Sequence, residues 1–263
     1  MKLAITGKGG TGKTLLAATI SRILAKQKTY SVLAVDADSN PSLAGALGIP
    51  EDIIKTIIPL SENQDLIEAR TGMGAGAFGA AFRLNPQVRD LIEKLHIPAP
   101  DGVRLLVMGT VQSTDGCMCP AFALIRALIR YLILKRDEMV VLDLEAGVEV
   151  FGRRVVEGMD AVLAVLEPSK RAVMTLERVV KLANKIQVRQ ILAVANKIES
   201  EGQAQFLKTA ADQLGIPLLG KIPRRGEAVE ADLHGIPLID YSPESPVIQS
   251  IESIIANLLS RSS

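Results

Sequence analysis

The residues best suited to chemistry lie near the start of the chain, in the segment Gly7–Thr14. Its sequence, GKGGTGKT, fits the phosphate-loop pattern G-x-x-x-x-G-K-[ST] at every required position. Glycines let successive backbone N–H groups turn inward around a phosphate, and the start of the following helix adds positive potential. Lys13 would supply charge for the β- and γ-phosphates, and the Thr14 hydroxyl would ligate Mg²⁺. We therefore predict a nucleotide-binding loop whose contacts are Gly9, Gly10, Thr11, Gly12, Lys13 and Thr14.

Carboxylates follow two predicted strands further along the chain. The apolar run Ser31–Val35 ends in Asp36 and Asp38, and the run Met139–Leu142 ends at Asp143. Because ligands of parallel α/β sheets bind at the carboxyl ends of the strands, we expect these aspartates to face the nucleotide. A hydrophobic strand that ends in aspartate is also typical of the Walker B motif, whose carboxylate holds Mg²⁺ through a water molecule.

Lys8 stands at a position where a generic phosphate loop accepts any residue. Beside two glycines, it resembles the K-G-G-x-G-K-[ST] loop of the MinD/ParA/nitrogenase-iron-protein class of ATPases. The resemblance implies that Lys8 reaches across a dimer interface to the nucleotide of the partner. It also implies that Asn196 reads the adenine edge, with Pro223 closing the other side of the base. The segment Asn196–Glu199 is similar to the N-K-x-D guanine signature as well, but glutamate is one methylene longer than aspartate, so ATP is favoured.

Strands and helices alternate along nearly the whole chain. The predicted strands are Lys2–Thr6, Ser31–Val35, Val103–Met108, Met139–Leu142, Ala161–Leu166, Gln190–Ala195 and Leu218–Ile222, and predicted helices include Leu15–Lys28, Phe122–Leu134 and Ser245–Leu259. This order predicts an α/β protein of the P-loop NTPase type, with a doubly wound, mostly parallel sheet and helices on both faces. We predict a single domain over residues 1–263.

Residues 50–100 interrupt this alternation. The stretch 72–79 is too rich in glycine for the interior of a stable helix or strand. We interpret the region as a glycine-rich insertion that is mobile or contacts a partner. His96, which lies in it beside Pro98 and Pro100, is interpreted as a surface residue rather than a ligand.

The bulk composition narrows the possible partners and compartments. Hydrophobic residues make up 48% of the chain and aromatic residues only 3%, which suits an aliphatic core around a parallel sheet. The formal net charge of +1 gives no electrostatic footprint for nucleic acid or an anionic membrane. No signal peptide precedes the first strand, and Arg126 and Arg130 interrupt the most apolar helix. We expect a soluble, cytoplasmic protein.

The two cysteines of the chain, Cys117 and Cys119, are separated by a single methionine. A disulfide between them would be strained and would not persist in the cytoplasm, whereas two inert buried thiols are possible. Gly116 and Pro120 place the pair in a turn at a helix start, which lowers thiol pKa values. Thiolates select soft ions such as Zn²⁺, Cu(I) or Ni²⁺. A closed site requires four ligands, however, and one chain offers two cysteines. A second copy of the chain across a twofold axis is the simplest completion.

Together these motifs resemble those of the CooC-type nickel-insertion ATPases, which serve carbon monoxide dehydrogenase, and their AcsF relatives, which serve acetyl-CoA synthase. The resemblance rests on Gly7–Thr14, Asp36–Asp38, Arg83–Pro86, Cys117–Pro120 and Asp143–Gly147. It implies an ATP-dependent metallochaperone whose homodimer binds one Ni²⁺ or Zn²⁺ through Cys117 and Cys119 of each subunit. ATP, Mg²⁺ and the client nickel enzyme are the other expected ligands and partners.

The same resemblance assigns roles to the acidic residues. Asp38 would orient or activate the attacking water, Asp143 would support Mg²⁺, and Glu145–Gly147 would sense the γ-phosphate. One alternative is a partitioning or positioning ATPase of the MinD/ParA kind, but the tail Pro246–Ser263 has Arg261 as its single base and so lacks a basic amphipathic helix. Another is a reductase like the nitrogenase iron protein, whose cluster uses two well-separated cysteines per chain.

Overall fold

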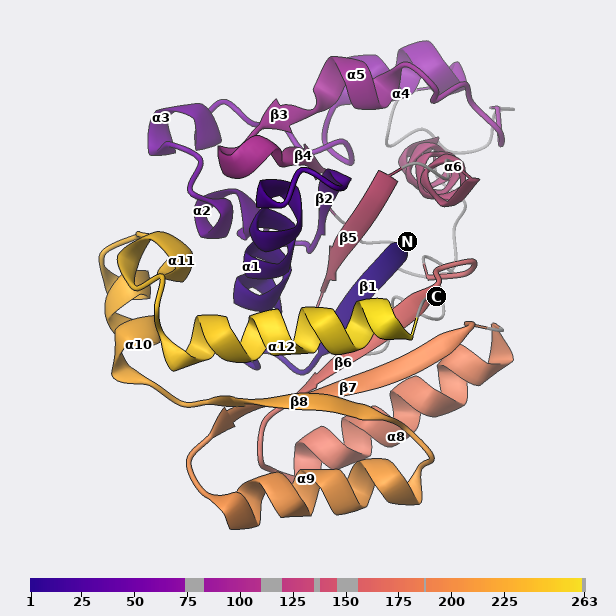
Figure 1. The fold of residues 1–263 in the computed structure, drawn as a ribbon. Helices are drawn as coiled ribbons and strands as arrows, with labels where there is room; N and C mark the ends of the chain where they lie inside the picture. Colours follow the sequence, from indigo (N-terminus) through magenta and orange to yellow (C-terminus); the bar gives the residue numbers. More distant parts are fainter. Residues whose placement is uncertain (74–82, 110–119, 135–137, 146–155, 187, 262–263) are drawn as a thin grey trace.

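The computed structural model describes residues 1–73, 83–109, 120–134, 138–145, 156–186 and 188–261. The described strands form one sheet in the order β3-β4-β2-β5-β1-β6-β7-β8 (Figure 1). Every neighbouring pair is parallel except β3 and β4. The doubly wound, mostly parallel α/β fold predicted from the sequence is thereby confirmed.

The strands are β1 (Lys2–Gly7), β2 (Ser31–Ala37), β3 (Ile97–Pro98), β4 (Arg104–Val107), β5 (Glu138–Leu144), β6 (Ala161–Leu166), β7 (Gln190–Ile198) and β8 (Leu218–Pro223). The helices are α1 (Lys13–Lys26), α2 (Leu43–Leu47), α3 (Glu51–Ile54), α4 (Gln64–Thr71), α5 (Leu91–Leu95), the 3₁₀ helix η1 (Pro100–Gly102), α6 (Pro120–Leu134), α8 (Lys170–Lys185), α9 (Glu201–Gln213), α10 (Gly226–Leu233), α11 (Leu238–Tyr241) and α12 (Pro246–Ser260).

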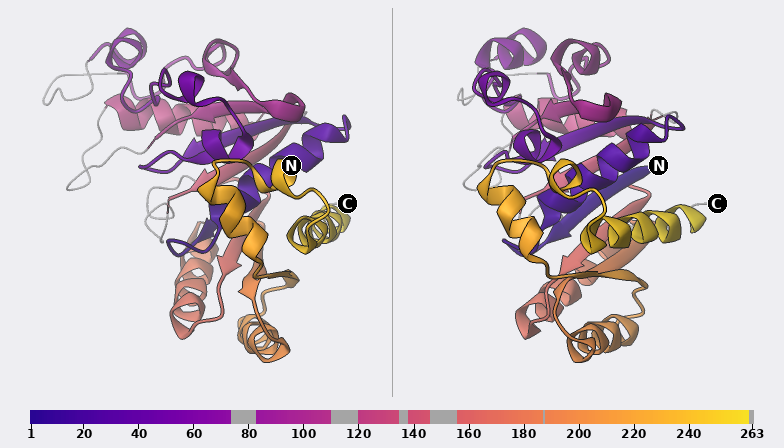
Figure 2. Two further views of the ribbon diagram at one scale, coloured as in Figure 1. Left: turned by 90° about the vertical axis from the view of Figure 1, so that its left-hand side faces the viewer. Right: turned by 60° about the vertical axis from the view of Figure 1, so that its left-hand side comes forward.

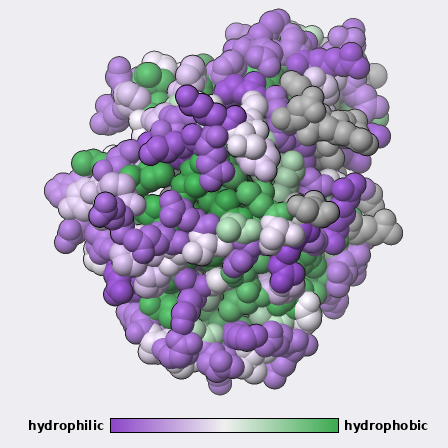
Figure 3. Space-filling model, in the orientation of Figure 1, coloured by the Kyte–Doolittle hydropathy of each residue, from purple (hydrophilic) through white to green (hydrophobic). Residues whose placement is uncertain are grey.

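Helices cover both faces of the sheet because its central strands are apolar on both sides. In β1, Leu3 and Ile5 pack into the cluster with α1 and α12, whereas Ala4 packs into the cluster with α6 on the opposite face. The turned views show helices on either side of the sheet (Figure 2). In the orientation of Figure 1, apolar residues gather in the middle of the molecular face and hydrophilic residues surround them (Figure 3). Alternate side chains of one buried strand thus pack into two hydrophobic layers, one on each face of the sheet.

The topology switches direction at β1. Strands β2, β4 and β5 lie on one side of β1, and β6, β7 and β8 lie on the other. A parallel sheet opens a crevice at such a switch point, outside the carboxyl ends of its strands. The register of β2 and β5 also pairs Asp36 with Asp143 at this edge. The phosphate loop that follows β1 therefore meets both acidic segments.

The structure changes the bounds of several predicted elements, including the helix predicted at Leu15–Lys28 and the strand predicted at Val103–Met108. Helix α1 begins at Lys13 and ends at Lys26, because Lys28 adopts a left-handed backbone with φ of 58° that closes the helix. Strand β7 runs on to Ile198 rather than ending at Ala195. The region predicted as an insertion contains α3, α4, α5 and the short antiparallel edge strand β3. Most of its glycine-rich stretch, 74–82, lies outside the described residues.

His96 lies at the end of α5 and is half-buried. Its Nδ1 atom lies 3.0 Å from the carbonyl oxygen of Ile92, one helical turn earlier. The ring therefore packs against the end of its own helix. Within the described ranges, no helix combines the length and apolarity that crossing a bilayer requires.

Candidate nucleotide site

The phosphate loop connects the end of β1 to the start of α1, and glycine is required in it for two reasons. Gly10 and Gly12 have φ of 77° and 90°, a left-handed backbone that a side chain would strain. A Cβ atom on Gly12 would also lie 2.5 Å from the Nδ2 atom of Asn196. The loop is therefore held close to the end of β7.

Hydrogen bonds within the loop converge on the carbonyl oxygen of Lys8. The Thr11 hydroxyl donates to it at 2.9 Å, and the Lys13 ammonium lies 3.4 Å from it. Thr11 and Lys13 are buried, whereas Gly9 and Gly10 are exposed. The charge of Lys13 thus lies over the curled backbone, where an entering phosphate would meet it.

Asp143 is the second-to-last residue of β5 and is nearly fully buried. Its Oδ1 atom has no hydrogen-bond partner among the described residues, while the Thr14 hydroxyl bonds to the carboxylate. Burial raises the pKa of Asp143 to about 7, a rise that the Thr14 hydrogen bond opposes and repulsion from Asp36 assists. An unpaired carboxylate oxygen beside a threonine hydroxyl suits a hydrated Mg²⁺ ion, which takes oxygen ligands and retains waters. The residues present therefore fit the magnesium site that the sequence predicts.

The raised pKa of Asp143 predicts how stability varies with pH in the nucleotide-free protein. The folded state holds this proton more tightly than the unfolded state, whose aspartate keeps a pKa near 3.8. The resulting stabilisation is complete below pH 3.8 and is lost as pH rises towards 7, by roughly 2–4 kcal/mol. We expect the melting temperature of Asp143→Asn to be higher than that of wild type at pH 8. We also expect its melting temperature to fall less than that of wild type between pH 5 and pH 8. Equal pH dependence of melting in both proteins would contradict the assignment.

Asp36 and Asp38 take different positions, although the sequence led us to expect both to face the nucleotide. Asp36 is fully buried, and its carboxylate accepts backbone N–H bonds from Asp38, Ser42 and Leu43 at 3.2, 3.0 and 2.8 Å. Burial raises the pKa of Asp36, and these bonds oppose the rise. Asp36 therefore shapes the loop after β2 and holds the start of α2, whereas Asp38 is half-buried and its Oδ1 atom accepts the backbone N–H of Asn40 at 2.9 Å.

A hydrogen bond joins the loop after β2 to the end of β5. The Ser39 hydroxyl donates to Oε1 of Glu145 at 2.8 Å, and it lies 3.4 Å from Oδ1 of Asp38. The loop after β2 is therefore in contact with Glu145, the first residue of the predicted γ-phosphate sensor. The remainder of the predicted sensor, residues 146 and 147, lies outside the described residues.

Lys8 forms an ion pair within its own chain. Its Nζ atom lies 3.5 Å from Oε1 of Glu167, which follows β6, and the two side chains are 41% and 27% exposed. Attraction between partly exposed charges is weak, so the pair can exchange partners. Action of Lys8 on a partner nucleotide remains a prediction.

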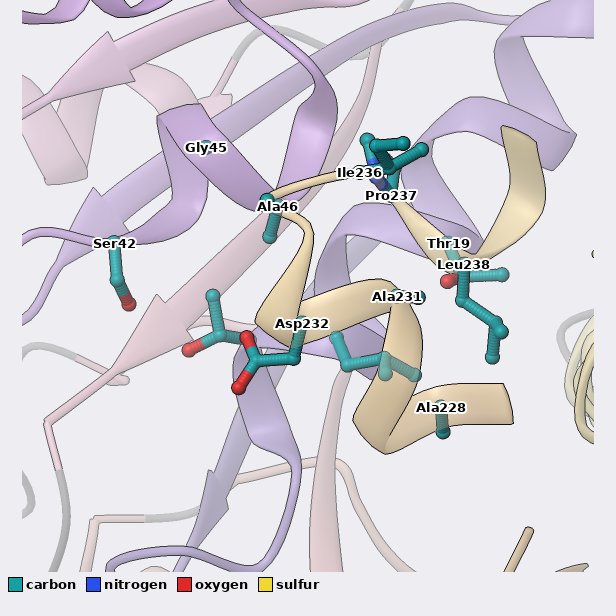
Figure 4. A pocket seen from close by; sticks show the side chains of 13 residues that line it. Thr19, Ser42, Gly45, Ala46, Ala228, Ala231, Asp232, Ile236, Pro237 and Leu238 are labelled. Carbon is teal, nitrogen blue, oxygen red and sulfur yellow. The ribbon is translucent and has the colours of Figure 1, made fainter. Parts of the chain in front are cut away.

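A cavity of about 530 Å³ opens beside the phosphate loop, a volume in the range of small-ligand sites. Six predicted nucleotide contacts from three separate segments line this cavity: Gly10, Gly12, Lys13, Thr14, Asn196 and Pro223. A smaller neighbouring cavity lies between α2 and α10, with Ser42 and Ala46 on one side and Asp232 on the other (Figure 4).

Asn196 contacts the phosphate loop directly. Its Nδ2 atom donates to the carbonyl oxygen of Thr11 at 2.7 Å, and its Oδ1 atom accepts from the backbone N–H of Lys197 at 2.9 Å. Sequence reasoning missed Lys197, whose ammonium donates to the carbonyl oxygen of Gly10. The sequence signal for it is the Asn196-Lys197 pair, which directly follows the apolar run of β7.

The predicted metal ligands Cys117 and Cys119 lie outside the described residues. Within the part of the chain that the structure describes, no group of three or more His, Cys, Asp or Glu side chains could hold a metal ion. The cysteine-bearing segment follows β4, which ends at the same edge of the sheet as β2, and it precedes Pro120 at the start of α6.

The phosphate loop follows the central strand of a mostly parallel sheet, and an aspartate of the Walker B pattern lies on the neighbouring strand. These two features define the protein as a P-loop ATPase. The narrower class follows from its relatives. The sequence pattern of the CobQ/CobB/MinD/ParA nucleotide binding domain matches residues 2–238.

The chain is 41% identical to an ATP-binding protein of Methanocaldococcus jannaschii, with 98% of each chain aligned. It is 38% identical to the carbon monoxide dehydrogenase accessory protein CooC of Rhodospirillum rubrum, over 92% of this chain and 91% of that one. The MinD cell division protein of Aquifex aeolicus has the same fold, with a TM-score of 0.69 at 21% identity over 98% and 96% of the chains. The chain therefore belongs to the CobQ/CobB/MinD/ParA nucleotide-binding family, in the group that contains CooC.

Proposed function

We propose that this ATPase is a cytoplasmic metallochaperone that couples ATP hydrolysis to nickel insertion into carbon monoxide dehydrogenase or acetyl-CoA synthase. The observation that carries the proposal is 38% identity, over nearly the whole chain, to a protein named as an accessory of carbon monoxide dehydrogenase. The Cys117-Met118-Cys119 motif supports it, because paired thiolates are ligands for soft ions such as Ni²⁺ and Zn²⁺.

The chemistry of hydrolysis is divided among residues from three segments. Lys13 holds the β- and γ-phosphates, and Asp38 orients the attacking water. Thr14 and Asp143 hold Mg²⁺, which neutralises charge on the phosphates when bound. Lys8 of a second subunit neutralises the charge that develops as the γ-phosphoryl group leaves.

Metal cargo and nucleotide are coupled in this proposal through a homodimer. Two thiolates from each subunit provide the four ligands of one closed site on the twofold axis. Strand β4, which precedes the cysteine segment in the chain, ends at the same edge of the sheet as β2, and in this proposal subunit closure moves both sites. Reciprocity then requires metal to strengthen ATP binding as much as ATP strengthens metal binding.

Activation of a client enzyme tests this function directly. We expect the nickel-loaded protein with ATP to activate metal-free carbon monoxide dehydrogenase or acetyl-CoA synthase faster than free nickel at the same concentration. A nonhydrolysable ATP analogue is expected to leave the metal on the protein. Activation that depends on nickel but is unaffected by nucleotide would contradict the proposal.

The intrachain pair of Lys8 and Glu167 yields a prediction about dimer formation. In Glu167→Gln, Lys8 loses its charged partner, so reaching the second subunit no longer requires breaking the pair. A symmetric dimer breaks two such pairs, each of which contributes up to about 1 kcal/mol, so we expect the dimer Kd with a nonhydrolysable ATP analogue to fall about two- to thirtyfold.

Sedimentation velocity over a concentration series measures this Kd. Asp212→Asn is the matched control, because it breaks the exposed pair of Asp212 with Lys208 on α9, remote from the phosphate loop. Weaker dimerisation of Glu167→Gln than of this control would show that Glu167 helps the dimer instead.

A further inference from the structure

Lys197 has an unusual backbone for a residue that carries a side chain. Its φ is 59°, in the left-handed region, and the pairing of β7 with β8 is irregular between Ala195 and Ile198. Such backbones are retained where the surroundings or a function fix them. The irregular end of β7 turns Lys197 towards the phosphate loop, where its ammonium donates to the carbonyl oxygen of Gly10.

Two consecutive residues of β7 thereby hold two consecutive carbonyl groups of the loop. Lys197 holds that of Gly10, and Asn196 holds that of Thr11. The bond between the Asn196 side chain and the Lys197 backbone N–H fixes the two donors relative to each other. Both side-chain donors to the phosphate loop thus come from one short segment of the sheet, which is distant from the loop in the sequence.

The orientation of these carbonyls decides where the loop directs its N–H groups. In a planar trans peptide, the carbonyl oxygen and the following N–H point in opposite directions. With the Gly10 and Thr11 oxygens held towards β7, the N–H groups of Thr11 and Gly12 point away from β7, and that of Thr11 donates to the carbonyl oxygen of Lys8 at 3.3 Å within the loop. The Thr11 bond closes the turn of the loop, and a loop curled in this way directs its remaining N–H groups at a phosphate.

We propose that Lys197 is a positioning residue for phosphate binding: it fixes the Gly10–Thr11 peptide, whose N–H closes the turn of the loop, while Asn196 fixes the Thr11–Gly12 peptide. The residue lines the same cavity as Lys13, yet its ammonium is bonded to the loop itself. This role concerns the binding of any adenine nucleotide by one chain, so it does not depend on the metal or on a dimer.

Three substitutions separate positioning from charge and from folding. Lys197→Met removes the donor and keeps the side-chain length. Lys197→Arg keeps a donor, and Lys197→Gly removes the side chain while relieving the left-handed backbone. Lys221→Met is the matched control, because Lys221 is an exposed lysine on neighbouring β8 that pairs with Glu201.

The measurements are the Kd for ADP, by titration with a fluorescent analogue, and the melting temperature without nucleotide. We expect Lys197→Met to weaken ADP binding about tenfold and Lys197→Arg to stay within about threefold of wild type. Lys197→Gly is expected to lose as much affinity for ADP as Lys197→Met. Its melting temperature is expected to equal or exceed that of wild type. The loss is expected to persist at about 0.5 M salt, where a purely electrostatic attraction would be screened.

Three results would overturn the proposal. The first is ADP affinity of Lys197→Met equal to that of Lys221→Met. The second is a loss that disappears at high salt, which would make Lys197 a source of charge only. The third is a loss that arginine does not restore and that accompanies a lower melting temperature in all three variants, which would indicate a folding defect.

Discussion

Replacing both cysteines by serine is expected to abolish metal binding and to leave nucleotide binding unchanged. In the Cys117→Ser, Cys119→Ser variant, all four proposed ligands of the shared site lose their thiolate, and serine hydroxyls are poor ligands for Ni²⁺ or Zn²⁺. We expect the affinity for either metal to fall by at least about 100-fold. The phosphate loop lies in a separate segment, so the Kd for ADP should stay at the wild-type value.

Nickel titration followed by thiolate-to-metal charge-transfer absorption measures this loss. The matched control is Met118→Leu, which keeps both thiols and the spacing between them. We expect this control to bind one metal ion per two chains, as wild type does. Metal binding that survives in the double serine variant with unchanged stoichiometry would remove the cysteines from the site.

Loss of Lys8 is expected to have the largest effect on hydrolysis. A charge delivered across an interface to the leaving phosphoryl group contributes a factor of roughly 10³–10⁵ to the rate. We therefore expect Lys8→Met to lower kcat at least about 1,000-fold. ADP binding by the separate chain should change little, because Lys13 supplies the charge within the loop and Lys8 points to Glu167.

Mixing two inactive variants distinguishes action across the interface from action within the chain. Lys8→Met retains Asp38, and Asp38→Asn retains Lys8. In a mixed dimer, the nucleotide on the Lys8→Met subunit would receive Lys8 from its partner and Asp38 from its own chain. Random pairing should then restore roughly a quarter of wild-type activity. A mixture as inactive as its components would show that Lys8 acts in its own chain.

Much of the fold could be predicted because its signals are local. The apolar run before Gly7–Thr14 and the helical spacing after it identified β1 and α1, and the position of Asp143 after an apolar run identified the end of β5. The edge strand β3 could not be found in this way. It is two residues long and contains Pro98, so neither length nor periodicity distinguishes it.

The contacts that organise the site were less predictable, because they join residues far apart in the chain. Lys197 and Gly10 are separated by 187 positions, and Ser39 and Glu145 by 106. The spacing of residues in the sequence does not predict such pairs, because strand order and register bring them together. The loop-shaping role of Asp36 is local by comparison, because its donors Ser42 and Leu43 follow it by six and seven residues, but it depends on the turn of the chain after β2.

The central claim is that two identical subunits share both the phosphate chemistry and one four-sulfur metal site. Sedimentation equilibrium of wild type with nickel and a nonhydrolysable ATP analogue, combined with metal analysis of the same sample, tests it most directly. The account predicts a particle of twice the chain mass of 28.1 kDa that carries one nickel ion. A monomer under these conditions, or a dimer with a complete metal site in each chain, would contradict it.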